Sequence, residues 1–548
     1  MNESERTSDL IVVGSGVGGL AAAATATSNG KSVTILEKGS VLGGSSGLSG
    51  AQLWIPGNEH MKEIGHEDSI EAAVEYLTHL AGELHADEGA ARRYVERAPE
   101  AVAYFEKEIG LEIQCIHGMP DYHSDGPGGR EEGRYLEPKP IDRDSIPVEL
   151  PDSPHLPGGA TNDELLTWGG AFTAQDWDWE IINRRREEGI ATMGTALIGY
   201  FLRAALKNGA DIRTEIPVTS LIVEDGQVIG VEIETESSDG HPETIRANLG
   251  VVLNTGAYDW NPDLIESFES TPAEHVASAA VPTATGDGHR MAALEGAKLG
   301  VYPPVGSAKG FFVAVPNREF LEAPLYRYCY NVGLPHAIAV TSAGERFCDE
   351  SFYPKQAAAL YDPTGEYPHF PPYMIFDEQY HRQYPLGSTL PGDPYDDTFL
   401  EAKASDLETL ADRLGMDNET LVRTVDRFNE HARQGEDPDF GRGENAWGHV
   451  WGGDPGHEPN PNLGPITEPP FYAVRLYIGL SSMGNVGLVT DPDARVLDWS
   501  DEAIDGLYAV GSVCAPVEWG IGYQSGLQNG RSMTDGYLAA KHVLESSR

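Results

Sequence analysis

Basic residues, cysteines and long apolar runs are all scarce in this sequence. Its 548 residues include 38 Lys and Arg against 86 Asp and Glu, a formal net charge of −48. Such an excess of acids repels phosphates, so nucleic acid binding by charge is excluded. The acids are spread along the chain and not gathered in a tail. This pattern favours a solvated acidic surface suited to a salt-rich cytoplasm, because salt screens the mutual repulsion.

The missing apolar runs and the few cysteines exclude further classes. No stretch approaches the ~18 uncharged apolar residues of a membrane-spanning helix, so no transmembrane segment is expected. Residues 1–6, MNESER, lack the basic start of a secretory signal, and we expect a cytoplasmic protein. None of the 4 cysteines has a partner at metal-site spacing, so neither a disulfide framework nor a metal site is predicted.

A nucleotide-binding pattern lies at the N-terminus. Residues 9–13, DLIVV, predict a strand, 14–19, GSGVGG, a tight turn, and the Ala-rich run that follows a helix. Gly14 permits the turn, Gly16 lets the backbone approach a pyrophosphate, and Gly19 lets the helix pack close to the strand. Glu37 follows a second strand, where its carboxylate can accept hydrogen bonds from a ribose. These features predict a dinucleotide site.

A second glycine- and serine-rich loop, GGSSGLSG at 43–50, follows Glu37. A plain NAD domain does not need this loop. With AQLWIPGN at 51–58, it resembles the flavoprotein superfamily of fumarate reductase, succinate dehydrogenase and 3-ketosteroid dehydrogenase, and within it the ketosteroid dehydrogenase branch. The resemblance implies FAD. Members that attach FAD covalently carry a His in this loop, and none lies at 43–50, so non-covalent FAD is expected.

Later segments resemble the same family's cofactor-binding pattern. A buried strand at 250–254 ends in a Thr-Gly turn, and another at 505–510 ends in Gly-Ser. Val218 is a candidate for a backbone contact with adenine. The residues expected to bind FAD are Gly14, Gly16, Gly18, Gly19, Glu37, Lys38, Gly43, Gly44, Ser45, Ser46, Gly50, Val218, Thr255, Gly256, Gly511, Ser512, Gly526 and Leu527.

The resemblance implies an α/β fold, with a split Rossmann-like FAD-binding domain and an inserted α+β cap. We expect the FAD domain at 1–278 and 462–548 and the cap at 279–461, with the second boundary in a stretch dense in turn formers. A Pro-, Gly- and acid-rich excursion at 118–159 predicts a lid, a binding segment or salt-adapted surface. Residues 405–434 show apolar residues near helical spacing.

Two motifs point to the chemistry. The cap motif GERFCDESFYP, at 344–354, has Pro354 where fumarate reductases carry a proton-donating Arg, and Tyr353 precedes it. The segment PVEWGIGYQSGL, at 516–527, resembles the Trp-Gly-x-Gly-Tyr-x-Ser-Gly pattern of the ketosteroid 4-dehydrogenases. The spacing of Tyr353 matches the same group. The Tyr-Pro-Gly-x-Gly pattern of the 1-dehydrogenases is absent.

The resemblance implies roles for four residues. Tyr523 and Ser525 would hydrogen-bond a substrate carbonyl and stabilise enolate character. Tyr353 would remove the proton beside that carbonyl while the next carbon gives hydride to FAD. Because a free Tyr has a pKa of ~10, this base needs a second group or a water path. Tyr122 resembles the Tyr that supports the base in the 1-dehydrogenases.

The nearby histidines and most tyrosines have a simpler interpretation. His123 and His289 are expected to be structural. With 23 tyrosines in the chain, any single one is more often a packing residue with a satisfied hydroxyl.

These observations predict an FAD-dependent oxidoreductase that dehydrogenates, or in reverse reduces, a carbon–carbon bond next to a ketone. The expected substrate is apolar and steroid-like, and an unidentified electron acceptor completes the cycle. A fumarate-like ene-reductase is the first alternative, and the missing Arg and His ligands argue against it. A flavin-binding redox partner without a substrate pocket is the second, and the tyrosine motif of the cap argues against that.

Overall fold

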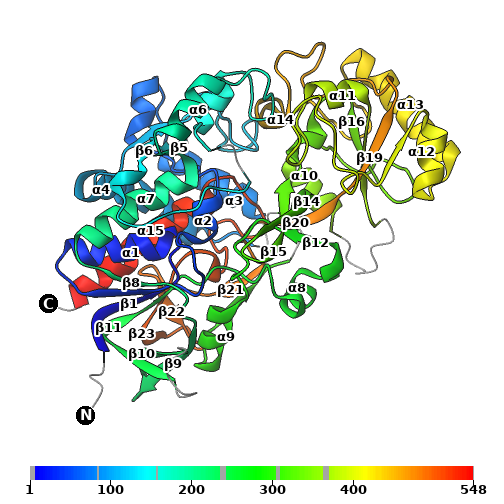
Figure 1. Ribbon diagram of the computed structural model, residues 1–548. Coiled ribbons are helices and arrows are strands. Elements are labelled where there is room, and N and C mark those ends of the chain that lie inside the picture. The colour runs from blue at the N-terminus through cyan, green and yellow to red at the C-terminus, as the bar shows by residue number, and fades with distance from the viewer. Residues whose placement is uncertain are drawn as a thin grey trace.

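The computed structural model describes residues 6–82, 85–155, 158–234, 242–303, 309–361 and 370–546. The chain forms a large lobe that holds both termini and a smaller lobe that holds α11 to α13, with a sheet containing β14 and β20 between them (Figure 1). The fold is of the α/β class, as the sequence predicts.

The main sheet of the large lobe has the strand order β22-β23-β11-β1-β2-β8, and β9 and β10 extend it as a hairpin beside β11. The pairs β8–β2, β2–β1, β1–β11 and β11–β23 are parallel. Its strands are β1 (Arg6–Val13), β2 (Val33–Leu36), β8 (Asp211–Arg213), β9 (Val218–Glu224), β10 (Gln227–Ile233), β11 (Glu243–Leu253), β22 (Arg495–Leu497) and β23 (Ala503–Ala509).

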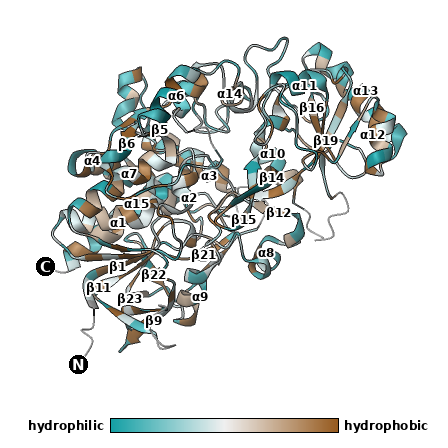
Figure 2. Cartoon of the chain, viewed as in Figure 1, coloured by the Kyte–Doolittle hydropathy of each residue, from teal (hydrophilic) through white to brown (hydrophobic). Residues whose placement is uncertain are grey.

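Small residues let the helices pack closely on this sheet. The helix α1 (Val17–Ser28) contacts both α7 (Met193–Lys207) and α15 (Leu527–Ser546), and hydrophobic residues concentrate where these helices meet (Figure 2). A Cβ on Gly19 would lie 2.6 Å from the carbonyl oxygen of Gly14, which confirms the expected close approach of helix and strand. A Cβ on Gly536 would lie 2.1 Å from the carbonyl oxygen of Gly18, so α15 also needs glycine where it crosses α1.

The rest of the large lobe lies above these helices and includes the excursion at 118–159. That segment forms β5 and β6 and belongs to the sheet β3-β5-β4 and the pair β6–β7. The elements are α2 (Gly44–Leu48), β3 (Leu53–Trp54), α3 (Ile70–Ala81), α4 (Glu88–Ile109), β4 (Ile113–Cys115), β5 (Tyr135–Pro138), β6 (Ile141–Asp142), α5 (Asn162–Thr167), α6 (Trp179–Glu187) and β7 (Ile190–Ala191).

Two sheets build the inserted part of the chain, with the orders β12-β20-β14-β15 and β16-β17-β19-β18. Their strands are β12 (Val276–Ser278), β14 (Gly310–Phe320), β15 (Ala323–Tyr328), β16 (Ala337–Val340), β17 (Tyr373–Phe376), β18 (Ala402–Ala404), β19 (Phe471–Arg475) and β20 (Tyr477–Leu480). The remaining elements are α8 (Pro262–Glu269), α9 (Asp287–Leu294), β13 (Leu299–Val301), α10 (Tyr353–Ala359), α11 (Glu378–Gln383), α12 (Leu407–Leu414), α13 (Asn418–Gln434), α14 (Ala446–Gly452) and β21 (Val486–Leu488).

Strand pairing moves the cap boundaries from those expected. β19 and β20 lie beyond residue 461, yet they pair with β17, β18 and β14 of the cap. The turn-rich segment before them is a loop of the cap, because the Asn462 side chain donates to the backbone oxygens of Gly333, Gly448 and Gly452. The cap therefore extends to about residue 480. At the other boundary, α9 contacts β9 of the main sheet, although it falls within the expected cap.

The helical pattern at 405–434 forms two helices, α12 and α13. Gly415 ends α12 with a positive φ of 72°, the left-handed conformation that favours glycine. Leu410, Leu421 and Val425 are buried in the cap core, as the spacing predicts.

Candidate active site

A deep cavity runs from the start of α1 toward the cap and encloses about 1180 Å³ of empty space, open solvent included. Most residues expected to bind FAD line it, namely Gly14, Gly16, Glu37, Lys38, Gly44, Ser45, Ser46, Val218, Thr255, Gly256, Gly511, Ser512 and Gly526.

The turn between β1 and α1 is shaped for a phosphate. Gly14 has a φ of 97°, and a Cβ there would lie 2.3 Å from the backbone oxygen of Asn254, so only glycine fits. The N-cap residue of α1 is Gly16, which has no side chain to cap the helix, and the Val17 N–H at the helix start makes only a long hydrogen bond of 3.4 Å to Ser46 Oγ, so this helix end is suited to an anion. Thr255 Oγ1 is buried on the cavity wall without a hydrogen-bond partner. The backbone N–H groups at the start of α1 and the Thr255 hydroxyl are suited to binding the phosphates of a dinucleotide.

Glu37 and Lys38 stand at the end of β2, on the cavity wall. The Glu37 carboxylate accepts hydrogen bonds from Ser15 N at 3.0 Å, Ser15 Oγ at 2.6 Å and Gly39 N at 2.8 Å. These donors fix the carboxylate where a ribose would meet it. Lys38 Nζ pairs with Asp287 at 2.8 Å, which ties β2 to α9.

Five residues expected to bind FAD do not line this cavity. Gly18 and Gly19 act in packing, as described above. Gly43 N donates to Ser15 Oγ at 2.9 Å, the Gly50 oxygen accepts from Asn162 at 2.8 Å, and Leu527 is fully buried at the start of α15. These five residues support the loops of the cavity from behind.

The three predicted tyrosines meet at the cap end of the cavity. The ring centroids of Tyr122 and Tyr523 lie 6.0 Å apart, those of Tyr353 and Tyr523 6.2 Å, and those of Tyr122 and Tyr353 6.4 Å. Tyr523 and Tyr328 line the cavity itself. Three segments distant in the sequence thus bring three phenols to one point.

Burial sets the electrostatics of this cluster. The pKa values of Tyr122, Tyr353 and Tyr523 are all raised, first by burial and then by the neighbouring phenols. The other groups that act on the three pKa values are neutral phenols and serine hydroxyls. All three are therefore neutral phenols at neutral pH, able to donate a hydrogen bond to a developing oxyanion.

Ser525 faces the tyrosines and a glutamine. Its hydroxyl donates to Gln52 Oε1, and its hydrogen bonding lowers the pKa of Tyr122 and of Tyr523. It does not line the cofactor cavity in the described structure. This geometry favours support of the two phenols over the direct carbonyl contact that the sequence predicts.

Gln524 is a fully buried residue that sequence reasoning missed, although it lies inside the predicted motif. Its Oε1 accepts from the Tyr122 backbone N at 3.0 Å and from Tyr76 Oη, and its Nε2 donates to Tyr135 Oη. Gln524 therefore fixes the Tyr122 segment against the Tyr523 loop.

The cap motif at 344–354 is largely structural. Arg346 binds Glu350 at 2.7 Å and Asp437 at 2.9 Å, and Arg442 binds Glu350 at 3.2 Å, all with buried side chains. This network holds the chain just before Tyr353. A Cβ on Gly310 would lie 2.4 Å from the Tyr353 ring, so a glycine of β14 makes room for the phenol.

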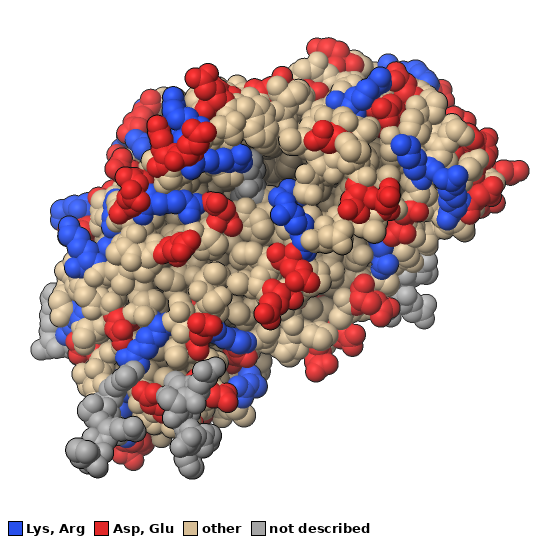
Figure 3. Space-filling view, in the orientation of Figure 1, with Lys and Arg blue, Asp and Glu red and all other residues tan. Residues whose placement is uncertain are grey.

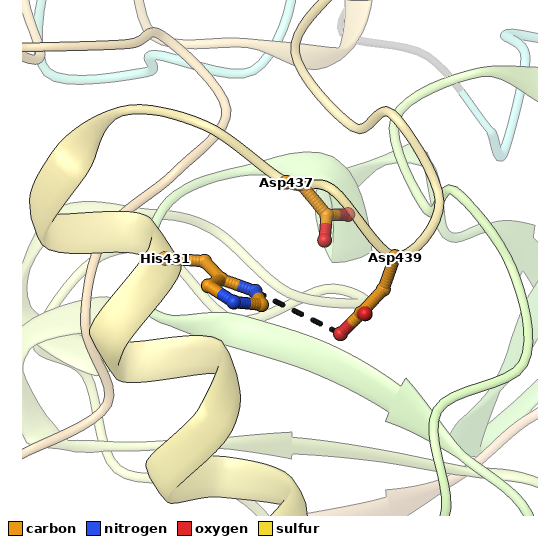
Figure 4. A group of neighbouring side chains, drawn as sticks. All are labelled: His431, Asp437 and Asp439. Carbon is orange, nitrogen blue, oxygen red and sulfur yellow. Dashed lines mark ion pairs between the residues drawn. The ribbon is translucent and has the colours of Figure 1, made fainter.

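The described residues include one group that could share a cation, His431, Asp437 and Asp439 (Figure 4). Asp437 already binds Arg346, and Asp439 accepts from Arg427 Nε at 2.7 Å. Arginines thus supply the positive charge, and the group is explained as an ion-pair cluster.

The surface agrees with the composition. Acids are scattered over both lobes in the view of Figure 3, where a hollow also opens between the lobes. None of the described helices is both long and apolar enough to cross a membrane.

Comparisons with known proteins match the whole chain. An FAD binding domain family matches residues 9–524. The 4-oxocyclohexanecarboxylate 2-dehydrogenase of Sinomonas cyclohexanicum is 35% identical over 98% of this chain and 93% of its own length. The 3-oxosteroid 1-dehydrogenase of Mycolicibacterium smegmatis is 32% identical over 98% of this chain and 97% of its own.

A solved structure is also similar to this chain over nearly its whole length. The 3-ketosteroid Δ1-dehydrogenase of Sterolibacterium denitrificans, in complex with 1,4-androstadiene-3,17-dione, has a TM-score of 0.88 and 30% identity, and covers 99% of this chain and 100% of its own. The relatives at 30% identity or more thus include 1-dehydrogenases, whereas the motif at 516–527 resembles the 4-dehydrogenases. The chain belongs to the FAD-binding flavoprotein superfamily of ketosteroid dehydrogenases and fumarate reductases, and is an FAD-dependent dehydrogenase of carbon–carbon bonds.

Proposed function

We propose that this enzyme holds FAD non-covalently and introduces a double bond next to the ketone of a cyclic substrate, of the oxosteroid or oxocyclohexanecarboxylate class. The observation that carries the proposal is the triangle of Tyr122, Tyr353 and Tyr523 at the end of the cofactor cavity. FAD, when bound, accepts the hydride and passes its electrons to an acceptor.

The residues divide the remaining work. Tyr523, on the cavity wall, donates a hydrogen bond to the ketone oxygen and stabilises enolate character. Tyr353 takes the proton from the carbon beside the ketone, and Tyr122 with Ser525 holds the two phenols in place. The aromatic residues around them, including Tyr330, Phe352 and Trp447, exclude water from the reacting carbons.

The side chains that line the cofactor cavity favour a ketone dehydrogenase over an enoate reductase. Lys38 is the one lysine or arginine among the described residues that line the cofactor cavity, and Asp287 already pairs with it. A dicarboxylate clamp needs cations at the reacting end, whereas a ketone needs hydrogen-bond donors. The site supplies the donors.

The test is anaerobic mixing of the yellow protein with three compounds: a saturated 3-oxosteroid, 4-oxocyclohexanecarboxylate, and cyclohexanecarboxylate, which lacks the ketone. We expect flavin bleaching by at least one ketone and none by the acid without it. Bleaching by neither ketone, with reoxidation of the reduced protein by fumarate, would contradict the proposal.

A further inference from the structure

The described rings that pack against the phenol of Tyr353 are themselves phenols, and none of them titrates near neutral pH. Its side chain is 2% exposed, and its ring neighbours are Tyr330 at 5.9 Å, Tyr523 at 6.2 Å and Tyr122 at 6.4 Å. Burial and then the phenols of Tyr330, Tyr328 and Tyr523 raise the pKa of Tyr353 well above that of a free phenol, and a hydrogen bond with Ser481 offsets this only in part. Tyr353 is therefore already protonated, and it can take a proton from a substrate carbon only if its own phenolic proton leaves to another group.

A second cavity, on the other side of Tyr523, offers an exit. Tyr353 and Tyr523 line it together with His123 and His79, and it holds about 610 Å³ of empty space, open solvent included. His123 directly follows Tyr122 in the chain and is half-buried, with its ring 5.3 Å from that of Phe352.

The cavity leads from the cluster to the surface. His79 lies near the end of α3 and is exposed, and its ring centroid is 6.0 Å from that of His123 in an edge-on arrangement. The wall thus presents a buried phenol, a half-buried imidazole and an exposed imidazole in that order.

The charges around His123 suit a proton acceptor. Burial lowers its pKa most, and His79 on α3 and Lys355 on α10 lower it further, while Asp125 on its own loop raises it. Lys355 Nζ in turn lies 3.8 Å from Asp349. His123 is therefore neutral at neutral pH, and each proton it accepts is readily passed on.

We propose that this second cavity is the proton exit of the enzyme, with His123 and His79 as its relay. The inference rests on the proposed function. Each dehydrogenation breaks two C–H bonds: one hydrogen leaves as hydride to FAD with two electrons, and the other leaves as a proton. Tyr353 Oη accepts that proton while its own passes, through water in the cavity, to His123, then to His79 and to solvent. Both histidines act through Tyr353 and do not touch the reacting carbons.

The experiment compares wild type, His123→Gln, His79→Gln and the surface control His66→Gln, all with FAD bound. Anaerobic mixing with the ketone gives the flavin bleaching rate from pH 5 to 10. Proton NMR in D2O gives the rate at which the carbon next to the ketone takes up deuterium. We expect His123→Gln to lose ~10-fold or more in both rates at pH 7, since general acid–base groups contribute about 10²–10⁴-fold and water replaces them only in part.

The pH profile and chemical rescue distinguish a relay from a structural role. In wild type, bleaching should slow only on the acidic side of about pH 6.5, the usual pKa of a histidine, because burial lowers the pKa of His123 below that value. In His123→Gln that limb should disappear, and the rate should rise with hydroxide. In His123→Ala, added imidazole should restore the rate, whereas pyrazole, a much weaker base of the same shape, should not.

Three different results would count against these claims. If wild type bleaches but His123→Gln and His79→Gln keep its rate and its acidic limb, the relay is wrong and the proposed function stands. If wild type bleaches with no ketone, the proposed function fails and the relay falls with it. Loss of rate without rescue by imidazole would assign His123 a structural role and overturn the relay.

Discussion

The backbone N–H of Tyr122 donates to the side-chain oxygen of Gln524 at 3.0 Å, and this bond joins the first third of the chain to its last motif. The adjacent rings of Tyr122 and Tyr523 meet because their backbones are tied in this way. The geometry of the tyrosine cluster thus depends on a buried amide that is not itself one of the tyrosines.

Replacing Gln524 should therefore disturb both stability and rate. Gln524→Leu leaves the Tyr122 N–H and the hydroxyls of Tyr76 and Tyr135 without their partner, and each buried unsatisfied group costs about 1–3 kcal/mol. We expect a lower urea midpoint and slower bleaching at full FAD occupancy. Gln227→Leu, on an exposed hairpin, is the matched control. A Gln524→Leu protein with unchanged midpoint and rate would contradict this role.

The carboxylate of Glu37 should contribute to FAD affinity. Glu37→Gln removes the charge that holds Ser15 and Gly39 and that we expect to accept hydrogen bonds from the ribose of FAD. Hydrogen bonds to charged groups contribute about 1.5–3 kcal/mol, so FAD should bind about 10- to 100-fold more weakly. Fluorescence quenching during titration of the apoprotein with FAD measures this. Glu75→Gln on α3 should bind as wild type does, and equal affinity in Glu37→Gln would refute the assignment.

The flavin should leave the protein on unfolding. No histidine stands at 43–50, the loop where covalent attachment occurs in relatives of the superfamily. Denaturation in guanidinium followed by ultrafiltration should give a yellow filtrate and colourless protein. Flavin retained on the denatured chain would show a covalent bond from another residue.

The raised pKa of Asp259 should make the free energy of unfolding depend on pH. It accepts from Ser482 N at 2.7 Å and Ser278 Oγ at 3.0 Å, and burial raises its pKa to about 6. The folded state therefore binds a proton more tightly than the unfolded state, where the pKa is ~3.9. Its contribution to stability is present at low pH and is lost as pH rises through about 6.

Asp259→Asn keeps an acceptor oxygen but cannot titrate. Relative to this variant, wild type should gain stability when the pH falls from 8 to 5, measured as urea midpoints at both values. Because all other groups are shared, the change isolates Asp259. An identical difference at pH 5 and pH 8 would rule out the raised pKa.

Local patterns predicted residues that the structure places on the wall of one cavity. Gly14, Gly16 and Glu37 belong to one strand–turn–helix–strand unit, so their spacing alone fixes where they lie. Tyr353 and Tyr523 were found through their motifs, and the structure brings them together. The sequence could not show which groups surround them, because burial and the pKa shifts arise from segments that meet only in the folded chain.

Other features could not be predicted from the sequence for the same reason. Gln524 bonds Tyr76 and Tyr135, which are distant in sequence, so no spacing marks it. His123 was expected to be structural, and only the fold shows that it shares a cavity with Tyr353. The cap boundary was misplaced because turn formers mark a loop within a domain as well as a boundary between domains.

The most direct test of the account is the anaerobic bleaching rate of Tyr523→Phe and Tyr353→Phe against wild type, with Tyr395→Phe in the cap as control. The account predicts full FAD binding in all four proteins and a loss of about 10²–10³-fold for Tyr523→Phe, the usual effect of removing one oxyanion donor. Tyr353→Phe should lose at least as much, because it removes the group that takes the proton. Bleaching at the wild-type rate in either variant would contradict the central role of the tyrosine cluster.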